Sequence, residues 1–363
     1  MTSSSKELKR TADYFVREIS RLVDRPLRLM EVCGTHTVAI FKSGIRQLLP
    51  ADVELVSGPG CPVCVTPNAY LDTAIAYSRQ DDVIITTFGD MLRVPGSSSS
   101  LAVQKADGAD IRIVYSPLES LEIAAANADK KVVFLAVGFE TTAPTSAATI
   151  LAAADAGVDN FYVLSAAKLV PPALRALCSS DVHLDGLILP GHVSAIIGER
   201  PYQFLVKDFA VPGVITGFEA LDILQAVYML VKQIALGKAE IENQYRRIVR
   251  PEGNSTACVM LKQVYEEEDA VWRGLGVIEG SGLRVNGKYR RFDATCHLPV
   301  EVEPTVEPSG CRCGEVLRGL VKPIDCPLFG EMCQPEQPVG SCMVSLEGAC
   351  AAWYRYGAGR WQM

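Results

Sequence analysis

Runs of apolar residues alternate with longer, mixed segments through the first two-thirds of the chain. Most of the runs are continuous rather than alternating with polar residues, and several are rich in valine and isoleucine. Such runs are typical of strands in parallel sheets that are covered on both faces. Eight strands are predicted, at residues 27–32, 53–57, 83–87, 111–115, 132–137, 161–165, 186–189 and 214–215.

The segments between these runs are long enough for helices, for example at residues 71–79, 119–128, 145–156 and 172–178. Strands that alternate with helices predict the α/β class, with parallel sheets and right-handed crossovers. A longer helical segment is expected from residue 221 to about residue 245, and an amphipathic helix is expected near the N-terminus. The tripeptide Gly-Phe-Glu occurs at 138–140 and again at 217–219, which is consistent with two related α/β halves.

The pattern changes towards the C-terminus. From Pro304 the chain is rich in proline, glycine and cysteine and has few long apolar runs. A segment of this kind buries little surface, so we expect a metal cluster to stabilise it. The predicted organisation is a first α/β domain at 1–125, a second at 126–245, and a small cysteine-rich domain at 246–363.

Composition narrows the possible environment and partners. The 363 residues are 48% hydrophobic and carry a net charge of -7, which is typical of a globular protein. An acidic chain is a poor match for nucleic acid, whose phosphates need a basic surface. There is no apolar run of 18 residues and no signal-peptide core, so we expect a cytoplasmic protein without a membrane anchor. Thiols are kept reduced in that compartment.

The twelve cysteines are unevenly distributed. Clusters of cysteine in a reducing compartment indicate metal or redox chemistry more often than structural disulfides. One group lies in the first fifth of the chain and the other in the tail: Cys33, Cys61 and Cys64, and then Cys311, Cys313, Cys326, Cys333, Cys342 and Cys350. The isolated Cys178, Cys258 and Cys296 are interpreted as structural.

Cys61 and Cys64 form a C-x-x-C motif. Two sulfurs at this spacing can close a disulfide or share a metal, and a redox dithiol is the favoured interpretation. A zinc half-site is the main alternative, but the chain has no second C-x-x-C to complete a four-thiolate site. An inert pair remains the third possibility.

Cys33 lies three residues before His36, where a predicted strand runs into a loop. The pair could bind a metal, or the histidine could stabilise a thiolate. A small buried cysteine beside an unrelated histidine would give the same pattern. The C-x-x-C motif about 28 residues further on favours a shared thiol site.

The tail cysteines follow the spacing C-x-C-x12-C-x6-C-x8-C-x7-C. Thiolate-rich sites select zinc or iron–sulfur clusters, and the irregular gaps lack the paired knuckles of zinc sites. We therefore expect a [4Fe-4S] cluster held by four of the six, with disulfides as the alternative. Glu140 and His192 follow predicted strands, where ligands of α/β folds bind. Taken singly, each is better interpreted as a cap or a buried structural residue, whereas together with Cys33 they could line one cleft.

Taken together and in this order, the motifs resemble those of the HypD family of hydrogenase maturation proteins. The matching strings cover nearly the whole chain: MEVCGTHT at 30–37, SGPGCPVCVTP at 57–67, VGFETTAPT at 137–145, LPGHVSAIIG at 189–198, CRCGEVLRG at 311–319 and CMVSLEGACAAWYRY at 342–356. The resemblance implies two similar α/β domains and a third domain with a [4Fe-4S] cluster. It also implies a scaffold that assembles the Fe(CN)2(CO) unit of [NiFe]-hydrogenase with the small chaperone HypC. Cyanide would come from HypE, and the finished unit would go to the hydrogenase large subunit.

The resemblance also suggests roles for individual residues. Cys33 would bind the transient iron, and Cys61 and Cys64 would be the redox pair beside it. His36, Glu140, Thr141 and His192 would lie in the same cleft. The cluster ligands would be Cys313, Cys326, Cys333 and Cys350, or Cys311, Cys326, Cys333 and Cys342.

Two other functions remain compatible with these residues. One is an iron–sulfur-dependent thiol–disulfide oxidoreductase acting through Cys61 and Cys64, which would not need the motif at Cys33. The other is a metal-binding scaffold without a redox role. The chain has no P-loop, no G-x-G-x-x-G fingerprint and no G-x-S-x-G elbow, so the sequence offers no support for nucleotide binding or hydrolase chemistry.

Overall fold

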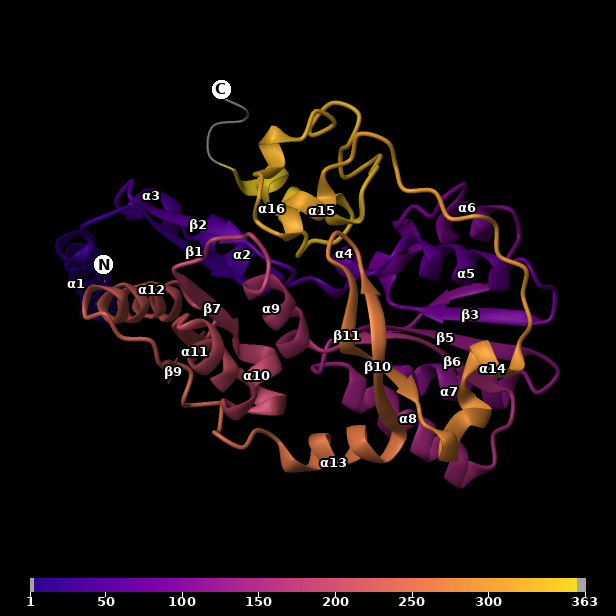
Figure 1. The fold of residues 1–363 in the computed structure, drawn as a ribbon. Coiled ribbons are helices and arrows are strands. Elements are labelled where there is room, and N and C mark those ends of the chain that lie inside the picture. The colour runs from indigo at the N-terminus through magenta and orange to yellow at the C-terminus, as the bar shows by residue number, and fades with distance from the viewer. Residues whose placement is uncertain (1–2, 358–363) are drawn as a thin grey trace.

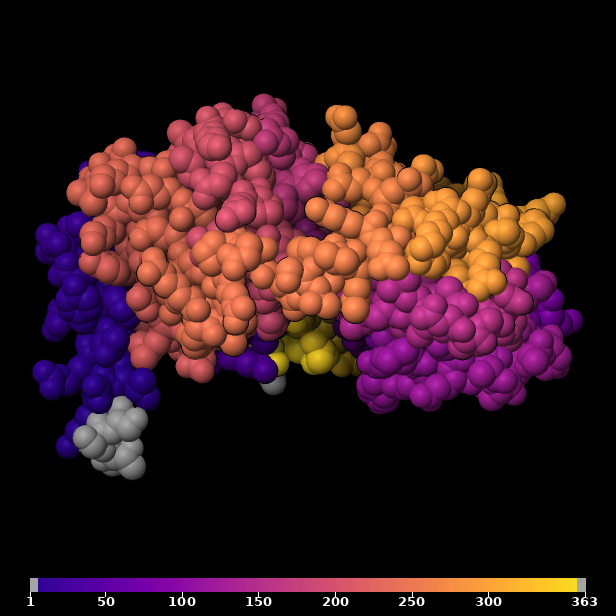
Figure 2. Space-filling model, turned by 90° about the horizontal axis from the view of Figure 1, so that it is seen from below, coloured from indigo at the N-terminus to yellow at the C-terminus, as the bar shows by residue number. Residues whose placement is uncertain are grey.

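The computed structural model describes residues 3–357 and confirms the α/β class (Figure 1). Two sheets lie side by side, each dominated by parallel strands, and the cysteine-rich tail lies above the region where they meet. Seen from below, the C-terminal part of the chain is visible between the two halves of the molecule (Figure 2). Within residues 3–357, no helix combines the length and apolar character needed to cross a bilayer.

The first sheet has five parallel strands in the order β2-β1-β7-β8-β9. Both of its faces are buried, as the continuous apolar runs predict. Leu29 and Ile188 pack with helices α1 and α12, whereas their neighbours Met30 and Leu189 belong to a different core. The elements are β1 (Leu27–Glu31), β2 (Val53–Ser57), β7 (Gly186–Pro190), β8 (Gly213–Thr216), β9 (Ile241–Asn243), α1 (Ser3–Leu22) and α12 (Ala220–Ala235).

The second sheet has six strands in the order β10-β11-β6-β5-β3-β4. Strands β3, β4, β5 and β6 are parallel, and the hairpin β10–β11 adds to the edge of β6 in antiparallel orientation. Helix α13 (Ser255–Val264) packs against α8 (Ala143–Ala156). The strands are β3 (Val83–Thr87), β4 (Ile111–Ile113), β5 (Lys131–Gly138), β6 (Phe161–Lys168), β10 (Tyr265–Trp272) and β11 (Gly276–Val285).

The strand pairing does not follow the predicted domain boundaries. Strand β1 pairs with β7, so the five-stranded sheet joins the first 57 residues to residues 186–243. The boundary predicted at residue 125 falls inside the six-stranded sheet, between β4 and β5. The division into 1–125, 126–245 and 246–363 stays a prediction about folding units.

Two details of the predicted secondary structure are wrong. The helix expected to reach residue 245 ends at Ala235, because Gly237 adopts a left-handed backbone (φ 63°) and the chain then forms β9. The hairpin β10–β11 was not predicted. Strand β10 carries the acidic run Glu266–Asp269 on exposed positions. It therefore lacks the continuous apolar run by which the other strands were predicted.

The remaining helices connect the strands and support the tail. Helices α5 (Asn68–Ser78), α7 (Pro117–Ala126) and α9 (Val170–Cys178) occur close to the predicted positions. The tail from residue 304 has little regular structure: α15 (Cys313–Leu317), η4 (Pro323–Asp325), η5 (Ser341–Met343) and α16 (Ala349–Tyr356). Helix α16 packs on α2 (Gly34–Lys42), with the Trp353 ring edge-on to Phe41 at 5.1 Å. The tail is thereby fixed to the element that follows Cys33.

Candidate functional site

The first thiol lies where strand β1 ends. Cys33 is 8% exposed and forms the N-cap of helix α2, with an extended backbone (φ -156°, ψ 126°). Strand β2 runs parallel to β1 with Ser57 opposite Glu31, and the Ser57 hydroxyl donates to Glu31 Oε1 across 2.7 Å. The loops that carry Cys33 and the C-x-x-C motif therefore leave the sheet side by side.

The C-x-x-C loop folds back onto the Cys33 backbone. A β-carbon on Gly60 would overlap the backbone of Cys33, so the approach requires glycine. Cys61 forms the N-cap of helix α4 (Pro62–Val65), and its sulfur accepts a 3.3 Å hydrogen bond from the Cys64 N–H. Both thiols are buried. The dithiol thus lies directly behind the loop of Cys33.

The tail reaches the dithiol from the other side. The Ser341 hydroxyl donates to the carbonyl oxygen of Cys64 across 3.0 Å, and the thiol of Cys342 forms a hydrogen bond with the Cys64 sulfur. Burial raises the pKa of Cys64 well above its ordinary value, and the bond with Cys342 opposes this effect only in part. Cys64 is therefore a protonated thiol at neutral pH.

All six tail cysteines line one small cavity, next to apolar residues such as Leu328 and Phe329. Cys342 also forms thiol hydrogen bonds with Cys313 and Cys350, and Cys313 forms another with Cys311. A β-carbon on Gly340 would lie 2.7 Å from the Cys311 sulfur, so this glycine leaves room for the thiol. All twelve cysteines of the chain are free, so the tail is not cross-linked by disulfides in this structure.

The tail donor set consists of sulfur, which suits a thiolate-bound cluster. Within residues 3–357, no group of three or more histidine, cysteine, aspartate or glutamate side chains is already arranged to hold a metal ion. Six sulfurs around a common cavity suit a multi-iron cluster, because each iron of such a cluster takes one thiolate from the protein.

A larger cavity of about 420 Å³ opens beside Cys33. Thr141 follows strand β5 and His192 follows β7, and both line this cavity together with Thr35 and Glu347. Its remaining walls are mostly apolar: Val32, Phe139, Pro190, Val193, Ala195 and Ile196. Of the predicted cleft residues, Cys33, Thr141 and His192 are thus brought together, and Pro62 of the C-x-x-C motif adjoins them.

His36 lies behind the wall of this cavity. It is fully buried, and its Nε2 lies 3.0 Å from the carbonyl oxygen of Gly217. The ring of Phe218 is stacked between the two histidines, 4.6 Å from His36 and 3.9 Å from His192. Burial lowers the pKa of His36 to about 4, so the imidazole is neutral at pH 7. We therefore interpret the His36 ring as a support for His192, while the backbone N–H of His36 donates to the Cys33 sulfur.

Glu140 is also buried outside the cavity wall. One carboxylate oxygen accepts a 2.9 Å hydrogen bond from the backbone N–H of Val170, and the other has no hydrogen-bond partner among the described residues. Burial without a nearby cation raises its pKa to about 7. The carboxyl group therefore changes protonation near neutral pH, which is a common property of residues in functional sites.

Comparison with known proteins identifies the family. A family model named HypD and described as "Hydrogenase formation hypA family" matches residues 10–357. The chain belongs to the HypD family. It is 49% identical to the hydrogenase maturation factor HypD of Escherichia coli K12 over 340 residues, which cover 93% of this chain and 91% of that protein. It is 46% identical to the Rhodobacter capsulatus HypD over 360 residues, covering 98% and 94%. A putative hydrogenase expression/formation protein of Methanocaldococcus jannaschii is 45% identical, covering 94% and 95%.

In this HypD-family chain, Glu347 is a site residue that the sequence analysis missed. It follows η5 in the tail, yet it lines the Cys33 cavity, and its carboxylate accepts a 2.6 Å hydrogen bond from the Thr35 hydroxyl. Burial, and then the Glu347 charge, raises the pKa of Cys33 to about 11. The only sequence signal for this residue was its position between Cys342 and Cys350 in a matching family string.

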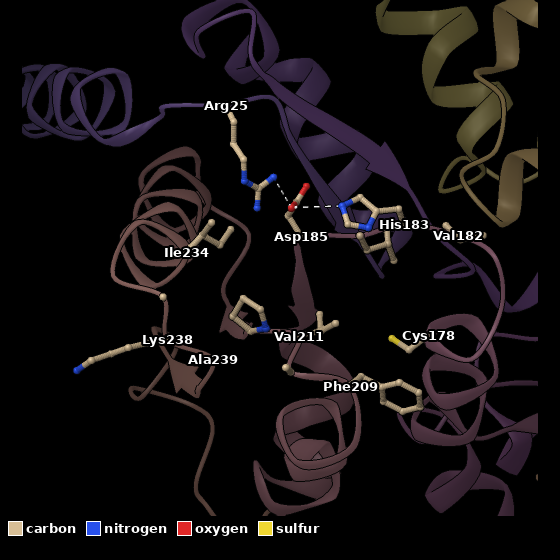
Figure 3. A pocket seen from close by; sticks show the side chains of 14 residues that line it. Arg25, Cys178, Val182, His183, Asp185, Phe209, Val211, Ile234, Lys238 and Ala239 are labelled. Carbon is tan, nitrogen blue, oxygen red and sulfur yellow. Dashed lines mark ion pairs between the residues drawn. The ribbon is translucent and has the colours of Figure 1, made fainter.

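The chain also has a cavity of about 460 Å³ that contains none of the predicted site residues. It lies beside the start of β7, at the opposite end of this strand from His192. Asp185 pairs there with Arg25 at 2.7 Å and with His183 at 3.5 Å (Figure 3). Asp185 is thus already paired with Arg25 and His183, so we assign the chemistry to the thiol-lined cavities instead.

Proposed function

We propose that this HypD-family chain is the scaffold on which the Fe(CN)2(CO) unit of [NiFe]-hydrogenase is assembled, with HypC as its partner and HypE as the cyanide donor. The observation that carries the proposal is the position of the C-x-x-C motif, which lies between Cys33 and the tail cysteines. Gly60 adjoins the Cys33 backbone on one side, and Cys64 forms a hydrogen bond with Cys342 on the other. A simple disulfide reductase would need only the second of these contacts.

Cys33 would provide the iron ligand on this protein. Its thiol is protonated at neutral pH, since its pKa is raised to about 11, so incoming Fe(II) must displace the proton to form the Fe–S bond. The neighbouring Glu347 carboxylate favours the approach of a cation to the cavity. The apolar walls suit cyanide and carbon monoxide, which form few hydrogen bonds once bound to iron.

Cys61 and Cys64 would supply the electrons for cyanide transfer. A thiocyanate group on the donor gives up its cyanide carbon to iron when its S–C bond breaks. In the balanced step, the two thiols form a disulfide, the donor leaves as a thiol, cyanide binds to iron and one proton is released. Restoring the dithiol takes two electrons and two protons. Four of the tail cysteines would hold a [4Fe-4S] cluster, which when bound supplies single electrons.

Anaerobic copurification with HypC, followed by infrared and Mössbauer spectroscopy, tests this function. We expect cyanide and carbonyl bands for the wild-type complex and their loss in Cys33→Ala. Cys178→Ala is the matched control, because Cys178 lies on helix α9 and does not line the Cys33 cavity. Bands that persist in Cys33→Ala would exclude Cys33 as the anchor. Disulfide-reductase turnover by the isolated protein, without iron-bound ligands, would favour the oxidoreductase function instead.

A further inference from the structure

The turn of the β10–β11 hairpin lies between the tail and helix α4, which we call the dithiol helix because it follows Cys61 and contains Cys64. The turn begins at Arg273, whose backbone N–H donates to the carbonyl oxygen of Val65 in α4 across 2.9 Å. Its next residue, Gly274, has a left-handed backbone (φ 80°), and a β-carbon there would overlap Gly314 in helix α15. Figure 1 shows the hairpin ending beside α4, directly below α15. Three segments far apart in sequence therefore meet at this turn.

The side chain of Arg273 joins these segments. It is 7% exposed, and its Nε and Nη2 donate to the Thr66 carbonyl oxygen across 3.1 and 2.9 Å. Nη2 also donates to Asn68 Oδ1 across 2.5 Å. Thr66 is the C-cap of α4, so the guanidinium binds the C-terminal end of the helix whose N-cap is Cys61. A cation is favourable at this end of a helix.

The guanidinium is a permanent positive charge close to the tail cysteines. Its carboxylate partner is Glu307, at 3.0 Å, whose side chain is 61% exposed and therefore screened by solvent. The guanidinium charge also interacts electrostatically with Cys311. Arg273 thus contacts the dithiol helix directly and the tail cysteines through its electric field.

Helix α4 has only four residues, so its position depends on these outside contacts. We propose that Arg273 is a positioning residue that holds the Cys61–Cys64 helix in its dithiol conformation and so sets the equilibrium between dithiol and disulfide. This inference rests on the proposed function in one respect, because it takes Cys61 and Cys64 as the redox pair. Releasing the end of α4 frees the two sulfurs to approach to the bonding distance of a disulfide, so the release favours the disulfide.

Redox titration of the full-length protein tests the proposal. Wild type, Arg273→Met and Arg273→Lys are equilibrated anaerobically in dithiothreitol buffers of defined potential. The Cys61–Cys64 disulfide is then measured by differential alkylation and mass spectrometry of the peptide. We expect Arg273→Met to favour the disulfide about tenfold, which for a two-electron couple is about 30 mV towards more negative potential. Arg273→Lys keeps the charge but not the forked donors, so its shift should be smaller.

Arg284→Met is the matched control. Arg284 lies on the same hairpin but is 55% exposed and pairs with Glu266 at 2.8 Å, so the titration should match wild type. If Arg273→Met fails to fold, Asn68→Ala removes one acceptor of the same guanidinium and should shift the equilibrium in the same direction. If folded Arg273→Met or Asn68→Ala protein titrates like wild type, the positioning role of Arg273 is overturned. The proposed function is not affected by that result. A wild-type protein that never forms the Cys61–Cys64 disulfide would overturn the redox pair, and with it both proposals.

Discussion

Thr35 donates its hydroxyl proton to Oε1 of Glu347 across 2.6 Å, although 312 positions separate the two residues along the chain. Thr35 belongs to the loop and helix that follow Cys33, whereas Glu347 lies between two tail cysteines. This bond places a tail carboxylate in the cavity of the thiol that we propose as the iron ligand. The tail therefore contributes a carboxylate to the electrostatic environment of Cys33.

Neutralising Glu347 should make Cys33 more reactive. The carboxylate adds to the effect of burial in raising the Cys33 pKa, so Glu347→Gln should lower that pKa while it keeps an acceptor for Thr35. We expect alkylation of Cys33 at pH 8 to become several-fold faster, since a decrease of one pKa unit raises the thiolate fraction about tenfold. The rate is followed by mass spectrometry of the Cys33 peptide. Glu336→Gln, at an exposed position of the tail, should leave the rate unchanged.

Adding a methyl group at Gly34 should separate the tail from the Cys33 loop. A β-carbon at this position would overlap the backbone oxygen of Glu347. Alanine forms helix better than glycine, so any loss of stability in Gly34→Ala reports the overlap. We expect a loss of about 1–3 kcal/mol in urea unfolding. In Gly287→Ala the added atom meets nothing within 4 Å, and equal stabilities for the two variants would contradict the prediction.

Glu140 should make stability depend on pH near neutrality. Its pKa in the folded protein, about 7, lies above the value of 4.5 for an unperturbed glutamate, so the folded state binds more protons between these two values. The stabilisation is complete below pH 4.5 and is lost as the pH rises through 7, by about 3 kcal/mol in total.

Glu140→Gln is a neutral substitute for the protonated form. We expect the variant and wild type to have similar unfolding free energies at pH 5, and the variant to be more stable at pH 8 by about 1–3 kcal/mol. Urea unfolding at four pH values between 5 and 8 measures the difference. Glu122→Gln, at an exposed position on helix α7, should follow wild type throughout. Parallel pH profiles for wild type and Glu140→Gln would show that Glu140 stays ionised in the folded protein.

Single serine substitutions of the six tail cysteines should divide them into ligands and non-ligands. Cys342 is hydrogen-bonded to Cys64, so we expect it to face the dithiol and expect the ligands to be Cys313, Cys326, Cys333 and Cys350. Those four variants should lose the iron–sulfur absorbance and bound sulfide after anaerobic reconstitution, whereas Cys311→Ser and Cys342→Ser should keep both. Retention by Cys313→Ser and Cys350→Ser, with loss by the other pair, would support the second ligand set.

Local pattern was enough to identify the class of fold and several of the segments that line the candidate site. All eight predicted strands occur, because a strand buried on both faces needs a continuous apolar run that can be seen within a few residues. Gly60 approaches Cys33 because their loops follow β1 and β2, which are consecutive strands of the chain and pair in parallel. Family motifs indicated that Cys33, Thr141 and His192 belong together, and they line one cavity.

Pairing between distant segments could not be read from the same pattern. An apolar run specifies a buried strand but not its neighbour. The pairing of β1 with β7, and the order in which the chain passes from one sheet to the other and back, therefore depend on the packing of the whole chain. Glu347 and Arg273 are ordinary polar residues in their local sequence. They acquire their positions beside Cys33 and Thr66 only when the tail and the hairpin fold against the thiol loops, because contacts of this kind depend on three-dimensional proximity rather than on spacing along the chain.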